Sequence, residues 1–220
     1  MSTEFHVSGL PVTFATKLES RWKATIREQL AEIQIEPAIA VALDFTLLSM
    51  ARAGHPFDLD NLCEPVLSEL SGAGWFRGKR PGLRQWSATK RLGPDTGVSI
   101  RLGSTAPSDS NAAPNHLYKG KLPRKGTDPT FIEWVERHLA RQLDLRASDS
   151  VGLALQFGSS RLNIGDIATG RVKNVIDCLF PVIGGTAGAP NDWKFDALYV
   201  KKEVEGLGED GLSIAIWPLE

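Results

Sequence analysis

Two aspartates in the segment FDLDNL, residues 57–62, have the residue type and spacing that could bind a cation. In an extended chain, Asp58 and Asp60 would project from one face, ~6.5 Å apart. At an effective dielectric constant of about 20, their repulsion is on the order of 2–3 kcal/mol, and a divalent cation between them would reverse that cost. The alternative is that one aspartate only caps the helix predicted to begin near Asn61, which requires no metal. The residues alone leave both interpretations open.

The second half of the chain holds further charged residues that could do chemistry. Lys173 and Asp177 are four apart in a helical pattern, and Asn191 and Asp192 follow a Gly-Ala-Pro turn. Taken singly, a Lys–Asp pair at this spacing indicates a solvated ion pair, and an Asn-Asp pair indicates a turn. Their significance depends on the elements that position them.

Those elements occur twice along the chain. Each half begins with an extended segment that contains Leu-Pro, and continues with a helix, an apolar strand, a second helix and a two-strand hairpin. Asp128 is the expected N-cap of the first helix of the second half, with Pro129 at its first position. Hydrophobic periodicity places the paired elements at residues 18–33 and 130–143, 38–48 and 151–157, 61–70 and 170–179, and 86–102 and 198–217.

The repeat predicts the domain organisation. We predict an α+β fold of two tandem β-α-β-α-β-β units, residues 1–104 and 115–220, joined by a linker at 105–114. Two packed units would form a single-chain pseudo-dimer. The alternative is one mixed α+β domain whose internal similarity is generic. The clearest match lies in the second helices, where three apolar residues of each half align: Val66, Leu67 and Leu70 with Val175, Ile176 and Leu179.

Together these features resemble one family, the RusA-type Holliday junction resolvases. Its members carry an Asp-x-Asp-Asn-Leu run, a Lys four residues after the second Asp, and an Asp four residues later with a Leu two beyond it. An acidic pair then precedes a strand that ends in Lys. The order of elements is also that of the family, so the resemblance covers nearly the whole chain, as two RusA-like units.

The first half holds only part of this signature. It has the complete run Asp58–Leu62, but Glu64 and Ser68 stand where the family has Lys and Asp. The segment GWFRGKRPG, residues 74–82, stands where the family has the later acid.

The second half holds the complementary part. In place of the Asp-x-Asp pair it has DIATG, with Asp166 one position out of register and Thr169 aligned with Asp60. The family signature is therefore divided between the halves. The matching residues of the second half are Lys173, Asp177, Leu179, Asn191, Asp192, Lys201 and Lys202.

The resemblance implies a metal-dependent, structure-selective DNA endonuclease that uses Mg²⁺, with Mn²⁺ as an alternative cofactor. By carry-over, Asp58, Asp60 and Asp192 would be catalytic metal ligands. Lys173 would be a fourth catalytic residue that contacts phosphate. A complete site requires the fold to bring Asp192 close to the other two aspartates. The alternative, which the divided signature favours, is a catalytically degenerate RusA-like module that binds DNA or docks in a larger assembly.

A basic segment with interspersed aromatic residues suggests a DNA-binding surface. No acidic residue occurs between Leu70 and Pro94. Lys and Arg would neutralise phosphates, and Trp86 would stack on an exposed base. The alternative is a solvated loop with Trp86 in the core. The predicted DNA-binding residues are Arg77, Lys79, Arg80, Arg84, Lys90, Arg91 and Trp86, with Lys121 and Lys125 of the other half.

Composition sets the remaining expectations. The 220 residues carry a formal net charge of -1, so attraction to DNA must come from a local basic patch. The chain lacks an apolar stretch of ~18 residues and a signal-peptide pattern, so we expect a cytoplasmic protein with no membrane partner. Its two cysteines cannot form a four-ligand zinc site, and without a Gly-rich phosphate-binding motif we expect no nucleotide cofactor. The expected partner is branched or duplex DNA, with protein partners as the alternative.

Overall fold

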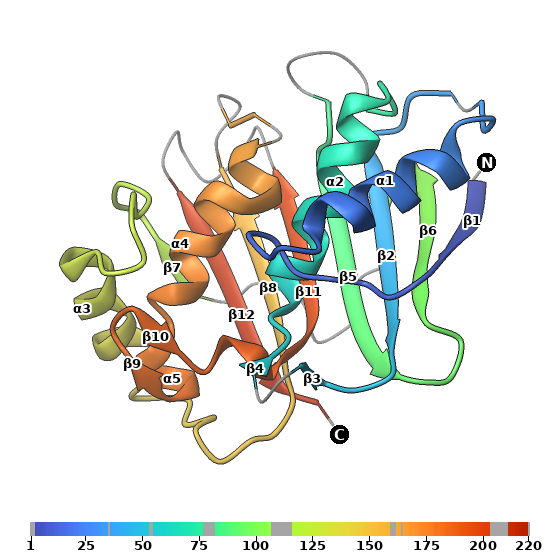
Figure 1. The fold of residues 1–220 in the computed structure, drawn as a ribbon. Helices are drawn as coiled ribbons and strands as arrows, with labels where there is room; N and C mark the ends of the chain where they lie inside the picture. The colour runs from blue at the N-terminus through green and yellow to red at the C-terminus, as the bar shows by residue number, and fades with distance from the viewer. Residues whose placement is uncertain are drawn as a thin grey trace.

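Eight strands form one mixed sheet in the computed structural model of the protein, with helices packed against it (Figure 1). The structure describes residues 3–34, 36–52, 55–76, 82–106, 116–158, 162–163, 165–202 and 211–219. The strands of the sheet are β1 (Thr3–Ser8), β2 (Ala40–Leu47), β5 (Gln85–Leu92), β6 (Gly97–Gly103), β7 (His116–Tyr118), β8 (Val151–Phe157), β11 (Phe195–Lys202) and β12 (Leu212–Pro218). The helices are α1 (Glu19–Leu30), α2 (Leu59–Gly72), α3 (Pro129–His138), α4 (Arg171–Asp177) and α5 (Phe180–Ile183), with a π-helical turn η2 (Asp166–Gly170) and a 3₁₀ turn η3 (Asp192–Lys194). Two small hairpins pair β3 (Ala51–Arg52) with β4 (His55–Pro56) and β9 (Gly185–Thr186) with β10 (Ala189–Pro190).

The strand order is the same in both halves of the chain. From the edge of the sheet to its middle, the first half contributes β1-β6-β2-β5 and the second contributes β7-β12-β8-β11. In each half the two inner strands are parallel, whereas the outer pairs are antiparallel. The halves meet where β5 and β11 pair antiparallel, with Leu198 opposite Ala88. The α+β class is therefore confirmed, as one mixed sheet that continues across both halves.

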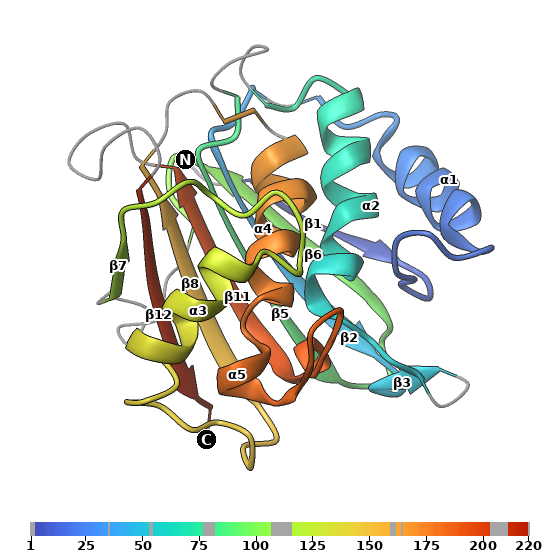
Figure 2. The same cartoon turned by 90° about the vertical axis from the view of Figure 1, so that its left-hand side faces the viewer.

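The helices cover one face of this sheet (Figures 1 and 2). Alternation along the strands turns Leu43, Phe45 and Trp86 towards the helices, where each is fully buried. Fully burying a large apolar side chain contributes roughly 1.5–3 kcal/mol relative to leaving it exposed. The buried apolar side chains of the two halves form one continuous hydrophobic core. The second-helix residues predicted to be buried, Val66, Leu67, Val175 and Ile176, are all 0% exposed.

The opposite face of the sheet carries polar, small and aromatic side chains. Arg101 forms an ion pair with Asp44 at 2.7 Å, and Thr89 donates a hydrogen bond to the same carboxylate at 2.6 Å. Tyr199 and Trp217 stack on each other, with ring centroids 6.1 Å apart. The strand positions that face away from the helices are therefore partly polar, and their polar side chains pair with one another.

The predicted start of α3 is confirmed. Asp128 is its N-cap, and the Oδ1 atom accepts hydrogen bonds from the backbone N–H groups of Thr130 and Phe131 at 3.2 and 3.3 Å. Pro129 occupies the first helical turn, where its missing N–H costs no helical hydrogen bond.

Candidate active site

The start of α2 positions the two aspartates of the DLDNL run. Asp58 is the N-cap residue and has an extended backbone, whereas Asp60 lies in the first helical turn and is only 3% exposed. The prediction that both project from one extended segment is therefore wrong, because the helix begins before Asn61. The Asp58 side chain makes no capping bond to the helix backbone; its Oδ2 accepts a hydrogen bond from Asn61 Nδ2 at 2.9 Å. Both carboxylates are thus placed by the helix start without capping it.

Lys173 of α4 joins Asp60 to the acidic residues of the second half. Its Nζ lies 3.6 Å from Asp60 Oδ2, 3.1 Å from Asp177 Oδ1 and 2.6 Å from Asp192 Oδ2. This contact is possible because α2 and α4 lie side by side on the sheet (Figures 1 and 2), and because η3 carries Asp192 directly before β11. The parts of the divided signature therefore meet around one ammonium group, although they lie far apart in the sequence.

The carboxylates of Asp58, Asp60, Asp177 and Asp192 and the ammonium of Lys173 form a group that we call the acidic cluster. It holds more negative than positive charge. Burial has the largest effect on Asp60 and raises its pKa to about 6, although Lys173 lowers it. Burial, followed by the charge of Asp192, raises the pKa of Asp58. Burial alone would lower the pKa of Lys173, but Asp60 and Asp192 raise it on balance. The carboxylates that interact with the Lys173 ammonium are Asp58, Asp60, Asp177 and Asp192.

A second buried lysine, Lys90 of β5, supports the backbone around this cluster. Its Nζ donates to the carbonyl oxygens of Phe57 at 2.6 Å and Trp193 at 2.5 Å, and lies 3.4 Å from Asp196 Oδ1. Burial lowers the pKa of Lys90, while Asp196 raises it. The DNA-binding assignment of Lys90 is therefore corrected, because its ammonium is used inside the protein to hold the segments that flank the acidic cluster.

Trp86 also requires a correction. Its side chain is 0% exposed, and its Nε1 donates to the carbonyl oxygen of Ile167 at 2.6 Å. A ring enclosed on all sides cannot stack on a DNA base. The alternative interpretation, in which Trp86 packs in the core, describes the structure.

The other basic residues lie on separate parts of the described chain. Arg84 and Arg91 are both exposed, but they lie at opposite ends of β5, roughly 23 Å apart for an extended chain. Lys121 and Lys125 are exposed in the segment before α3. DNA binding remains a prediction for these four residues. The remaining predicted residues, Arg77, Lys79 and Arg80, lie outside the described residues.

The acidic cluster suits a hard divalent cation in donor type and charge. Mg²⁺ is usually held by one or two carboxylates together with water and phosphate oxygens. Asp58, Asp60 and Asp192 offer such carboxylates, and burial, the largest cause, raises the pKa of the first two, with the negative charge of Asp192 as a further cause. Among the described residues, however, no group of three metal-ligating side chains has the arrangement of a metal site. In the structure, the ammonium of Lys173 is the positive charge that lies between the carboxylates of Asp60 and Asp192.

Three supporting residues, Asp177, Lys90 and Asp196, are absent from the catalytic set that the sequence predicts. A signal existed for Lys90, because alternation along β5 puts it on the same inward face as Trp86. The spacing of Asp177 from Lys173 also matches the family pattern. We find no comparable sequence signal for Asp196.

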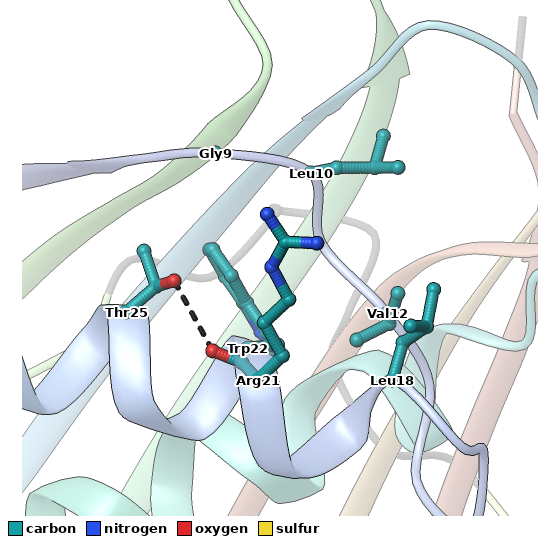
Figure 3. Close-up of a pocket in the computed structure, with 7 residues that line it drawn as sticks. All are labelled: Gly9, Leu10, Val12, Leu18, Arg21, Trp22 and Thr25. Carbon is teal, nitrogen blue, oxygen red and sulfur yellow. Dashed lines mark hydrogen bonds between the residues drawn. The ribbon is translucent and has the colours of Figure 1, made fainter.

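A separate pocket of about 290 Å³ lies between the Leu-Pro segment and α1 (Figure 3). Figure 3 shows the Arg21 side chain reaching across it towards Leu10. None of its lining residues is acidic, so it offers no carboxylate for a metal or a general base. The residues that line it are Gly9, Leu10, Val12, Leu18, Arg21, Trp22 and Thr25.

Comparisons with known proteins do not assign a family. Neither protein-family models nor curated proteins match this sequence. In the described part of the chain, no helix has the length and apolar character needed to cross a bilayer. Function must therefore be inferred from the site itself.

Proposed function

We propose that the chain is a metal-dependent, structure-selective DNA endonuclease of the RusA type that acts on branched DNA. The observation that carries this proposal is the contact of one ammonium, that of Lys173, with both Asp60 and Asp192. Residues that the resemblance divides between the two halves thereby lie in one place. The shared strand order supports the related proposal that the halves are two RusA-like units in a single-chain pseudo-dimer.

Each residue of the cluster has a role in this proposal. Asp58, Asp60 and Asp192 would hold Mg²⁺ or Mn²⁺, which neutralises phosphate charge and lowers the pKa of bound water. Lys173 orients the carboxylates of Asp60 and Asp192, and its side chain is 31% exposed, so its ammonium can also donate to an approaching phosphate oxygen. Lys90 keeps the neighbouring backbone in place through its two carbonyl contacts.

Asparagine variants test this assignment. Asp60→Asn and Asp192→Asn should abolish Mg²⁺-dependent cleavage of a labelled four-way junction, while binding in a gel-shift assay persists or strengthens because repulsion of phosphate falls. Asp166→Asn is the matched control, since asparagine keeps an oxygen that can accept the Asn163 N–H. Circular dichroism would verify that each variant is folded. Undiminished cleavage by a variant lacking both Asp58 and Asp60 would place the active site elsewhere.

A second candidate function is a non-catalytic RusA-like module that binds DNA or docks in a larger assembly. The observation that favours it is the position of Lys173, whose ammonium already pairs with the carboxylates of Asp60, Asp177 and Asp192. Salt-sensitive junction binding without cleavage, in either Mg²⁺ or Mn²⁺, would favour this module. If branched, duplex and single-stranded DNA all fail to bind, a protein-docking role would remain.

A further inference from the structure

We propose that the chain has one functional cleavage site rather than two, and that it therefore cuts a single strand of branched DNA in each binding event. This inference rests on the proposed function. The two halves share one strand order about the central β5–β11 pair, so each strand of the large sheet in one half has a counterpart in the other. The acidic cluster accordingly has a counterpart position at η2, which contacts α2.

The residues at the counterpart position differ in chemistry from those of the acidic cluster. Aligning the second helices puts Glu64 at the position of Lys173 and Thr169 at the position of Asp60. The counterpart position therefore has an acid where the acidic cluster has its central ammonium. It also has a neutral hydroxyl residue where the acidic cluster has its most buried carboxylate.

The two acids near the counterpart position, Glu64 and Asp166, contact residues of the protein in different ways. Glu64 Oε2 lies 3.6 Å from Lys23 Nζ of α1. Asp166 accepts a hydrogen bond from the backbone N–H of Asn163 at 3.1 Å, and its own backbone N–H donates to Asn163 Oδ1 at 3.0 Å. This reciprocal pair satisfies backbone groups at a helix start, as capping residues do. Asp166 is therefore used by the backbone at this helix start. Glu64 Oε2 is buried without a hydrogen-bond partner, so its ion pair with Lys23 is the contact that offsets its charge.

Asp192, the acid that precedes β11, has no counterpart in the first half of the sequence either. Residues 71–94, the equivalent stretch of the first half, contain no Asp or Glu. By contrast, the supporting lysine occurs in both halves. Lys202, buried at the end of β11, donates to the carbonyl oxygen of Leu162 at 3.0 Å, much as Lys90 of β5 donates to that of Phe57. A buried lysine that donates to a backbone carbonyl is thus present in both halves, whereas, among the described residues, three aspartates meet a lysine only at the acidic cluster.

A single site has a direct consequence for the product. Cutting two opposing strands within one complex requires two sites that act before the DNA dissociates. A chain with one site leaves a nick, and a second cut requires the DNA to be released and bound again. The expected product class is therefore nicked branched DNA rather than a resolved pair of duplexes.

Single-turnover cleavage of a supercoiled plasmid with one cruciform distinguishes these products. Protein bound to the plasmid is mixed with Mg²⁺ and an excess of unlabelled four-way junction, which prevents rebinding. We expect nicked circles as the end product. Linear plasmid formed in the presence of the competitor would overturn the single-site inference while supporting the endonuclease proposal. Uncut plasmid would overturn both.

Calorimetric titration with Mn²⁺ provides a readout that does not depend on cleavage. We expect one Mn²⁺ site per chain, lost in Asp60→Asn and kept in the matched variant Asp166→Asn. Two sites per chain, or loss of binding in Asp166→Asn but not in Asp60→Asn, would overturn the inference. The absence of any Mn²⁺ site would overturn it together with the metal-dependent function.

Discussion

Replacing Asp60 with asparagine should stabilise the folded protein at neutral pH much more than at acidic pH. Asp60 is 3% exposed, and its pKa is raised from 3.8 to about 6 in the folded chain. The folded state therefore binds the proton more tightly than the unfolded state does. Stability attributable to this group is greatest below pH ~4 and falls as the pH rises to ~6, because the carboxylate must then be ionised inside the protein.

The size of the effect follows from the shift in pKa. The raised pKa of Asp60 lowers the free energy of unfolding by about 3 kcal/mol at pH 7.5, where the carboxylate is ionised in both states. At pH 4.5 the loss is about 1 kcal/mol, because Asp60 is then largely protonated in the folded state. Asparagine resembles the protonated side chain and carries no charge. The stability of Asp60→Asn relative to wild type should therefore be about 2 kcal/mol more favourable at pH 7.5 than at pH 4.5.

Urea unfolding at the two pH values measures this difference. The variant Asp166→Asn, which removes a negative charge outside the acidic cluster, controls for the change in net charge. If Asp60→Asn changes the free energy of unfolding equally at both pH values, ionising the buried Asp60 carboxylate does not destabilise the folded protein. A wild-type protein that gains stability between pH 4.5 and 7.5 through Asp60 would show that Lys173 more than offsets its burial.

Other variants test the supporting residues and the predicted DNA surface. Trp86→Phe should lower the free energy of unfolding in urea by about 2–4 kcal/mol, because it leaves a small cavity and an unpaired Ile167 carbonyl; a change below 0.5 kcal/mol or so would argue against the core position. Lys90→Met should slow junction cleavage by roughly 10–100-fold with unchanged affinity in a gel-shift assay, as expected for a residue that positions the site; a loss of affinity alone would instead point to phosphate contact. Arg84→Glu should weaken junction binding and flatten the slope of log K against log salt by about 0.9 for each phosphate that the protein no longer neutralises. Arg91→Glu tests the other end of β5 in the same titration, and an unchanged slope would remove that residue from the interface.

Local patterns allowed much of the fold to be predicted. The period of the apolar residues located the paired helices and strands, and Asp128-Pro129 correctly marked the start of α3. The start of α2 was less predictable, since an aspartate at the N-cap and one in the first turn are both favourable there. Pattern alone therefore could not choose between a helix that begins at Leu59 and one that begins near Asn61.

The site depended on contacts that no local pattern encodes. Lys173 reaches Asp60 because β5 and β11 pair at the centre of the sheet. This pairing could not be predicted from the local sequence pattern. Segment composition was misleading for Trp86 and Lys90. In the sequence they occur among other basic residues, but β5 turns both towards the core. A run of basic residues suggests one surface, whereas strand alternation divides it between two faces.

The most direct measurement of the central claim is the position of a bound cation. Crystals grown with Mn²⁺ and a junction that resists cleavage would locate the ion by its anomalous scattering. We predict one peak per chain, in contact with carboxylates from both halves, Asp60 from the first and Asp192 from the second. A peak whose protein ligands all come from one half, or no peak beside Asp60, would contradict a composite site.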